Sequence, residues 1–316
     1  MTAERNLVLV HTPDYQAVED FQIIGRAVQE RAPDIEVFIA SNSISSSVTR
    51  RQAGRRPSLI FSPATLLSFR PVRGKVYAGS PIPKLEQLER FQAAGLPVPP
   101  TAEIKPIVDL PKARFGSHVV VKPGYSESSR GQFITLMRRE AVSFQPRERF
   151  AQDHAGRYGP MLAQKFIDTG VFVNHYRVLT LFGTPLLAFK TTSETPRPTL
   201  DSSDEELATI ALKARRRDGP ITREFTSDSD VLELARRAYS ALPEIALQGV
   251  DIIREAGSSK LYLLEANPGG NTWIFSKGHL TARLKKALGV ERLTDQFDAF
   301  RTAAKALIER TRAEAE

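Results

Sequence analysis

The sequence predicts a protein of mixed α/β and α+β class with two domains. Strands and helices alternate over residues 1–79, and the segment Pro81-Ile82-Pro83 punctuates the chain directly afterwards. Antiparallel hairpin signals follow one another in the remainder. A length of 316 residues suits about two domains, because domains cluster near about 100–150 residues. We therefore expect an N-terminal α/β domain over residues 1–79 and a second domain over residues 80–316.

The N-terminal domain is expected to hold a small parallel sheet. Short apolar runs at residues 6–10, 35–40, 58–61 and 75–78 predict its strands, and apolar residues recur at helical spacing over residues 15–28. Helical connections between strands make parallel pairing the default. No Gly-x-Gly-x-x-Gly motif follows these strands, so the sequence holds no dinucleotide fingerprint.

The second domain is predicted to contain helices and antiparallel strands. The expected elements are a helix that ends at Gly95, strands at 118–121, 132–136 and 161–167, a hairpin of 176–182 with 185–191 about Gly183-Thr184, a helix at 231–242 and a helical segment at 280–312. Residues 193–227 are rich in Ser, Thr, Pro, Arg and Asp, with one helix near residues 205–217. Insertions of this length in a compact domain are usually functional or mobile.

Composition excludes several classes of protein. No run approaches the roughly 20 apolar residues of a membrane helix, and no signal-peptide pattern opens the chain, so we expect a cytoplasmic protein. The absence of cysteine excludes disulfides, zinc–thiolate sites and a cysteine nucleophile. A net charge of +8 favours anionic ligands. The basic clusters near residues 50–56 and 213–217 lack interleaved aromatic residues, so nucleic-acid binding is a minority interpretation.

The segment 249–267 carries the strongest chemical signal. Two apolar runs flank Gly257-Ser258-Ser259, which predicts a hairpin in which Asp251 lies opposite Glu265. Like charges in directly opposed positions are destabilising, and strand alternation brings Asn267 to the same face. An oxygen-only set of this kind suits Mg²⁺. The alternative is an ordinary amphipathic hairpin with exposed acids.

Two further segments are candidates for binding phosphate. Lys122 ends a predicted strand, and the small residues of the loop 124–131 would let backbone N–H groups approach a polyphosphate. The loop lacks the Gly-Lys-Ser/Thr of a Walker A motif, and a plain surface hairpin is an equal alternative. Lys84, at the start of a predicted helix, is a weaker candidate.

Taken in order, these segments resemble the ATP-grasp superfamily, including ribosomal-protein glutamate ligases, glutathione synthetases and D-alanine–D-alanine ligases. The resemblance covers about residues 80–275. The quoted motifs are Pro83-Lys84-Leu85 with Ala94–Pro99, Val120–Pro123, the loop Ser126–Gly131, Ala163–Ile167, Tyr176-Arg177-Val178 with Phe189-Lys190, Gly249-Val250-Asp251 and Leu264–Pro268.

The resemblance implies an ATP-grasp fold with an N-terminal pre-ATP-grasp domain and with lobes at about 80–165 and 166–316 that hold ATP between them. It also implies roles for individual residues. The cofactor-binding residues would be Lys84, Lys122, Ser126, Ser128, Ser129, Gly131, Gln164, Lys165, Phe166, Ile167, and either Asp168 or Asn174 at the ribose. Asp251, Glu265 and Asn267 would hold two Mg²⁺ (or Mn²⁺) ions, and Arg177, Lys190 and Asn271 would act on the transferring group.

Some positions depart from the family pattern. Gln164 stands where a carboxylate is common, and Lys190 where an arginine is frequent, although lysine cannot make the same two-pronged contact. Glu127 adds a negative charge to the phosphate loop. These departures affect nucleotide contacts and leave the metal set intact.

The leading functional expectation is an ATP-dependent carboxylate–amine ligase. It would act on small-molecule or peptide carboxylates and amines, with no membrane partner and with a homodimer left open. Two alternatives are a small-molecule kinase of the same fold, which would retain phosphate on its product, and a non-catalytic nucleotide-binding module, which would lack a metal ligand.

The segment 269–273 is expected to bind the acid substrate. Consecutive glycines offer backbone N–H groups to a carboxylate, and Trp273 would form an apolar wall. Arg197, Arg223 and Lys277 are weaker candidates for a further anionic group, with surface charge as the alternative. The sequence thus predicts an acid substrate, often one that resembles an amino acid.

Overall fold

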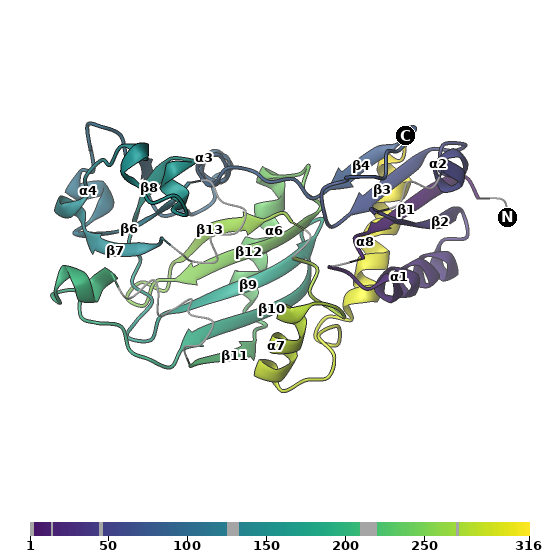
Figure 1. Cartoon of the computed structure of the whole chain (residues 1–316). Coiled ribbons are helices and arrows are strands. Elements are labelled where there is room, and N and C mark those ends of the chain that lie inside the picture. Colours follow the sequence, from purple (N-terminus) through teal and green to yellow (C-terminus); the bar gives the residue numbers. More distant parts are fainter. Residues whose placement is uncertain (1–2, 14, 44–46, 125–132, 209–219, 270–271) are drawn as a thin grey trace.

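The computed structural model describes residues 3–13, 15–43, 47–124, 133–208, 220–269 and 272–316. Three sheets follow one another along the molecule, with the N-terminal sheet at one end and a small antiparallel sheet at the other (Figure 1). A five-stranded sheet lies between them. The predicted mixed α/β and α+β class is confirmed.

The N-terminal sheet is parallel, as predicted, with strand order β2-β1-β3-β4. Its strands are β1 (Arg5–His11), β2 (Ile35–Ser41), β3 (Ser58–Ser62) and β4 (Lys75–Ala78), with helices α1 (Val18–Arg31) and α2 (Ser47–Ala53) between them. The short helix α2 was absent from the sequence prediction. Apolar residues of α1 and β1 are fully buried against one another, which ties the sheet to its helix.

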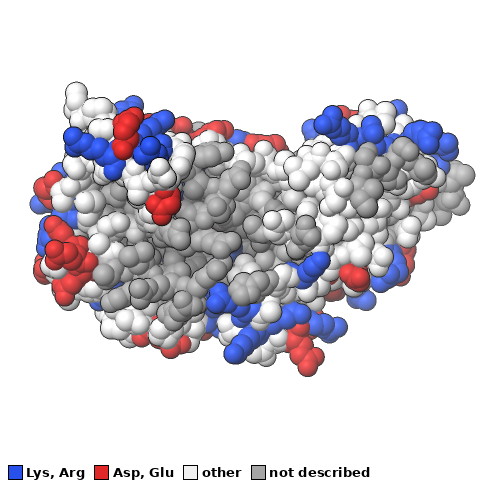
Figure 2. Space-filling model, viewed as in Figure 1, with Lys and Arg blue, Asp and Glu red and all other residues white. Residues whose placement is uncertain are grey.

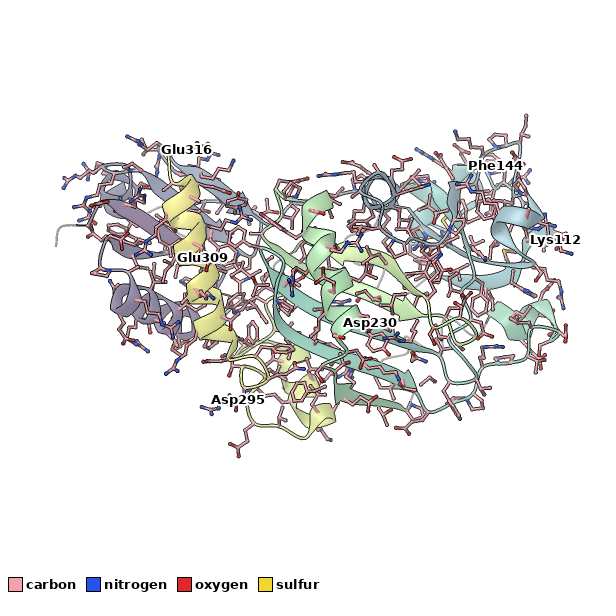
Figure 3. The ribbon with its side chains drawn as sticks, turned by 180° about the vertical axis from the view of Figure 1, so that it is seen from behind. Lys112, Phe144, Asp230, Asp295, Glu309 and Glu316 are labelled. Carbon is pink, nitrogen blue, oxygen red and sulfur yellow. The ribbon has the colours of Figure 1, made fainter. Side chains whose placement is uncertain are left out.

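The C-terminal helix α8 (Ala299–Glu314) packs on α1 and on the N-terminal sheet. Figure 3 shows α8, marked by Glu309, lying beside the strands of the chain's other end. The predicted helical segment 280–312 is in fact two helices, α7 (His279–Leu288) and α8, because Gly289 with φ +67° ends α7. The C-terminal helix therefore packs on the N-terminal part of the chain.

The small sheet has strand order β5-β8-β6-β7, and its registered neighbours run antiparallel. Its strands are β5 (Thr101–Glu103), β6 (His118–Pro123), β7 (Thr135–Arg138) and β8 (Met161–Lys165). The helices α3 (Lys84–Ala93) and α4 (Lys112–Phe115) precede β6, and short 3-10 turns lie at Arg139–Ala141, Arg147–Arg149 and Ala155–Arg157. Gly95, with φ +69°, ends the α3 segment as predicted.

The central sheet has strand order β11-β10-β9-β12-β13 and is antiparallel throughout. Its strands are β9 (Asn174–Leu181), β10 (Thr184–Ser193), β11 (Ile221–Phe225), β12 (Leu247–Arg254) and β13 (Leu261–Asn267). Helix α6 (Ser229–Ala241) crosses the back of this sheet, with Asp230 near its start (Figure 3), and α3 packs beside it. One face of the central sheet is thus covered by helices.

Two local predictions differ from the structure. The β9–β10 hairpin turns on Phe182-Gly183, both with positive φ, one residue earlier than expected. The expected insertion 193–227 contributes the edge strand β11, and residues 204–208 within it are helical. Residues 209–219 of the insertion lie outside the described residues.

The remaining features of the fold are the length of its helices and the charge on its surface. In the described ranges, no helix is long and apolar enough to cross a membrane. On the face that Figure 2 shows, the coloured Lys and Arg side chains form separate groups near α4, α7 and the N-terminal sheet, interspersed with Asp and Glu.

Candidate active site

The site is centred on a row of side chains across three strands of the central sheet. Arg177 of β9 is directly opposite Asp251 of β12, and Asp251 is directly opposite Glu265 of β13, as predicted for the last pair. In the next row, Gly249 is opposite Asn267. Because directly opposed residues share a face, all four side chains lie on the face away from α6.

Each carboxylate in the row has a cationic partner. Arg177 binds Asp251 with two prongs: Nε donates to Oδ1, and Nη2 donates to Oδ2 at 2.7 Å. Lys84, at the start of α3, brings its Nζ to 3.2 Å from Oε2 of Glu265. The pKa of Arg177 is raised: burial opposes its charge, but the attraction of Asp251 and of Glu265 outweighs that effect. The repulsion between the two acids is therefore compensated.

Asn267 completes the group. Its Nδ2 donates to the carbonyl of Gly249 at 3.1 Å and lies 3.4 Å from Asp251 Oδ2 and 3.5 Å from Glu265 Oε1. A Cβ at Gly249 would crowd its neighbours, because it would lie 3.0 Å from the Thr272 side chain and 3.3 Å from Nη1 of Arg177. The three predicted metal ligands are thus brought together.

The donor set suits a hard cation. Asp251 is 4% exposed, and the three side chains offer two carboxylates and one carboxamide, whose oxygen replaces its nitrogen after a half-turn of the amide. Mg²⁺ takes such oxygens and usually completes its shell with water and phosphate. In the described part of the chain, no group of three or more His, Cys, Asp or Glu residues could hold a metal.

Two predicted nucleotide-binding residues of the small sheet, Lys122 and Gln164, lie on the same face. Lys122 is 6% exposed, and its Nζ donates to Oε1 of Gln164 at 2.9 Å. Gln164 in turn donates to the hydroxyl of Thr101 at 2.9 Å. This network fixes Gln164, so its amide has a defined orientation on β8. Lys165 is next along β8 and points to the opposite face.

The residues after β8 are held by other parts of the protein. Phe166 lies under the guanidinium of Arg197, whose Cζ is 5.9 Å from the ring centroid, and Ile167 is buried. Asp168 accepts from Arg197 Nη2 at 2.8 Å and from the Gly170 amide. Of the two ribose candidates, Asp168 is thus already ion-paired.

Asn174, the other ribose candidate, donates to the carbonyls of Thr169 and Phe172. Its amide therefore closes the loop between β8 and β9. The nitrogen of the Asn174 amide donates both of these hydrogen bonds, and its oxygen is the atom that can accept one.

Lys190 is not brought together with Arg177, Asp251 and Glu265. It is directly opposite Tyr176, and residues 176 and 177 alternate, so Lys190 lies on the face opposite to that of Arg177. Its Nζ is 5.7 Å from the Tyr176 ring centroid and 3.9 Å from Glu224. The expectation that the side chains of Arg177 and Lys190 act at the same point is not met. The sequence motif does not determine the strand register, and the register places the two side chains on opposite faces of the sheet.

Trp273 is a core residue, contrary to the expectation of a substrate wall. It is 2% exposed, donates from Nε1 to Asp20 of α1 at 2.9 Å, and packs among Phe21, Phe275 and Phe300. It joins the segment after the metal ligands to the N-terminal domain.

The three weaker anion candidates are also engaged or distant. Arg197 is bound to Asp168, Lys277 donates to the carbonyl of Pro13, and Arg223 lies on the edge strand β11. Ser126, Ser128, Ser129, Gly131 and Asn271 lie outside the described residues.

A cavity of about 450 Å³ opens beside the row. Glu265, Asn267 and Lys84 form one end of it, and residues that follow the carboxyl ends of β1, β2 and β3 form the other, among them Thr12, Asn42 and Thr65. Sequence reasoning missed these three. The available signal was the rule that open parallel sheets bind ligands beyond the carboxyl ends of their strands.

Similarity to known proteins is found at the level of structure. No protein-family model matches the sequence, and no curated protein sequence matches it. The chain is similar to the ATP-grasp ligase PsnB complexed with a minimal precursor, with a TM-score of 0.51 and 16% identity over 97% of this chain and 100% of that one. PsnB complexed with a phosphomimetic precursor variant, Mg and ADP gives a TM-score of 0.50 at 14% identity, over 98% and 100% of the two chains. The D-cycloserine synthetase DcsG gives 0.50 at 16% identity, over 97% and 99%.

Proposed function

Because the chain has the ATP-grasp fold, we propose that it is an ATP- and Mg²⁺-dependent ligase. It would activate a carboxylate as an acyl phosphate, which an amine then attacks with release of phosphate. The observation that carries the proposal is the row of Arg177, Asp251 and Glu265 with Asn267 beside it, in which Glu265 and Asn267 line the end of a ligand-sized cavity. Phosphoryl transfer requires mainly positioned charge, which this row supplies without a covalent nucleophile.

In this proposal the nucleotide lies between the small and the central sheets. Gln164 would meet the adenine, with Lys165, Phe166 and Ile167 forming the hinge, and Asp168 or Asn174 would meet the ribose. The buried ammonium of Lys122 and that of Lys84 would neutralise phosphate oxygens. Support comes also from PsnB, whose complexes include Mg and ADP with precursor.

Asp251, Glu265 and Asn267 would hold the metal through their side-chain oxygens. The bound ions would neutralise the charge that develops on the transferring phosphoryl group. Both acids already face a cation, Arg177 and Lys84 respectively, so each carboxylate has a defined orientation before any metal binds. Arg177, held by Asp251, would remain beside the transferring group and steady its oxygens.

The acid would enter through the cavity between the metal-ligand row and the N-terminal sheet. Its carboxylate would lie at the end formed by Lys84, Glu265 and Asn267, where the acyl phosphate forms. Lys84 would then serve both the acid and the phosphate as a point charge.

The test is a screen of carboxylic acids with ATP, Mg²⁺ and hydroxylamine as the trapping nucleophile. We expect hydroxamate to form together with ADP and free phosphate. ADP release with phosphate retained on an alcohol would instead identify a kinase. ATP turnover that no acid or alcohol stimulates would refute both forms of transfer.

A further inference from the structure

The cavity next to the metal-ligand row has an uneven distribution of charge. Among the described residues that line it, only Lys84 and Glu265 carry a charge, and their side chains are 3.2 Å apart at one end. The remaining wall is uncharged, and much of it is apolar, including Tyr15, Leu67 and Ile82.

The polar groups of the far wall mainly bind one another. The Asn42 amide donates to the Thr65 carbonyl at 2.8 Å and to the Thr12 hydroxyl at 3.2 Å, and its oxygen accepts from Leu67 N at 2.8 Å. Since Thr12 accepts this bond, its own hydroxyl hydrogen can be donated to a ligand. The far wall therefore offers neutral hydrogen bonding and no cation within the described lining.

The near side of the cavity is also held in place, by hydrogen bonds and by close packing of the backbone. Gln87 of α3 donates to the Ile82 carbonyl and accepts from Ala266 N, both at 2.9 Å, which ties the linker to β13. Gly79 fits between the carbonyls of Pro63 and Pro268, and a Cβ there would overlap both oxygens. The wall is thus fixed relative to Glu265.

On the basis of the proposed function, we infer that this cavity selects acids whose body, apart from the reacting carboxylate, has no second anionic group. A second carboxylate would leave water for a wall whose described residues offer it no cation, and such desolvation is strongly unfavourable. An uncharged body of amino-acid or small peptide size would bury apolar surface against the same wall and would fit a pocket of this volume. The sequence-based expectation of a further anion site, at Arg197, Arg223 or Lys277, is replaced by this preference, since none of the three lines the cavity.

The test compares two acids of equal shape, N-acetylglutamine and N-acetylglutamate. Calorimetry on the full chain, with Mg²⁺ and a non-hydrolysable ATP analogue, is expected to give at least about tenfold tighter binding of N-acetylglutamine. Ala64 lines the far part of the cavity, so Ala64→Lys should reverse the preference, whereas the uncharged Ala64→Met should keep it. Unchanged affinity for the ATP analogue verifies that both variants are folded.

The outcomes separate the inference from the proposed function. Equal or tighter binding of N-acetylglutamate, no binding of either acid, or a ratio that Ala64→Lys does not alter overturns the inference. If the expected preference is found but no hydroxamate forms, the cavity selects acids as inferred and the ligase proposal is wrong. If hydroxamate forms readily from acids with a second carboxylate, the ligase proposal stands and the inferred selectivity is wrong.

Discussion

Asp251 and Glu265 lie directly opposite each other, although the hairpin that connects their strands turns differently from the prediction. Near the turn, Arg254 is opposite Leu261 and Ile252 is opposite Leu263, one position out of register with the Asp251–Glu265 pair. A bulge between Asp251 and Ile252 restores the pairing. The predicted pairing of Asp251 with Glu265 is therefore correct, but it results from the bulge and not from a three-residue loop.

The first prediction concerns Glu265. Glu265→Gln should abolish ATP turnover and leave the fold intact, because it removes the charge that would be shared between two cations and that faces Lys84. Glu224→Gln is the matched control, since Glu224 is on the opposite face of the same sheet beside Lys190. Turnover would be measured as ADP release. Wild-type turnover in Glu265→Gln would remove Glu265 from the site.

The second prediction concerns Arg177 and stability. Arg177→Met removes the guanidinium that binds the buried Asp251 carboxylate, which should lower the free energy of unfolding by roughly 3–5 kcal/mol without metal. Mg²⁺ should then raise the melting temperature of this variant more than that of the wild type, because the ion would replace the lost positive charge. The control is Arg236→Met, an arginine with a 63% exposed side chain. Equal Mg²⁺ shifts in both proteins would argue against a metal at Asp251.

The third prediction separates phosphate contacts from base contacts. Lys84→Ala and Lys122→Ala should weaken binding of ATP far more than binding of adenosine, because each removes an ammonium group that would neutralise phosphate oxygens. Lys112→Ala, at an exposed lysine of the same lobe, is the control (Figure 3). Calorimetric titration with both ligands gives the two losses. Equal losses for ATP and adenosine would mean that these lysines are structural.

The fourth prediction concerns pH and Asp20, the partner of Trp273. Burial raises the pKa of Asp20 above its ordinary 3.8, against the opposing hydrogen bonds of Ser276 and Trp273. The folded state therefore retains the proton longer than the unfolded state, and stability from this group falls as pH rises from 3.8 through the raised pKa.

Asp20→Asn keeps an acceptor for Trp273 and removes the buried charge. It should stabilise the protein at about pH 7 and have a smaller effect at about pH 4, where the wild-type carboxyl is partly protonated in both states. Urea unfolding at the two pH values checks this. A stability change that is the same at both values would contradict the assigned origin of the shift.

Trp273 shows why function could not be assigned from a neighbouring motif alone. It follows the metal ligands closely in sequence, which suggested a substrate contact. In the structure, the Thr272 hydroxyl donates to the Asn267 carbonyl at 3.0 Å, and Trp273 is buried in the core. The residue type of Trp273 does not distinguish a core position from a substrate contact.

The sequence by itself determined most of the element types, the parallel N-terminal sheet and the pairing of Asp251 with Glu265, because periodicity, turn residues and paired acids are local signals. Tertiary structure decided which face each side chain occupies: strand register, together with one bulge, joins Asp251 to Arg177 and Glu265 and separates Lys190 from them. It also decided the cavity, since Thr12, Asn42 and Thr65 meet Glu265 only when the N-terminal sheet packs against the central one. A one-residue shift in register reverses a strand's faces, and contacts between distant segments depend on packing, so no local pattern encodes either.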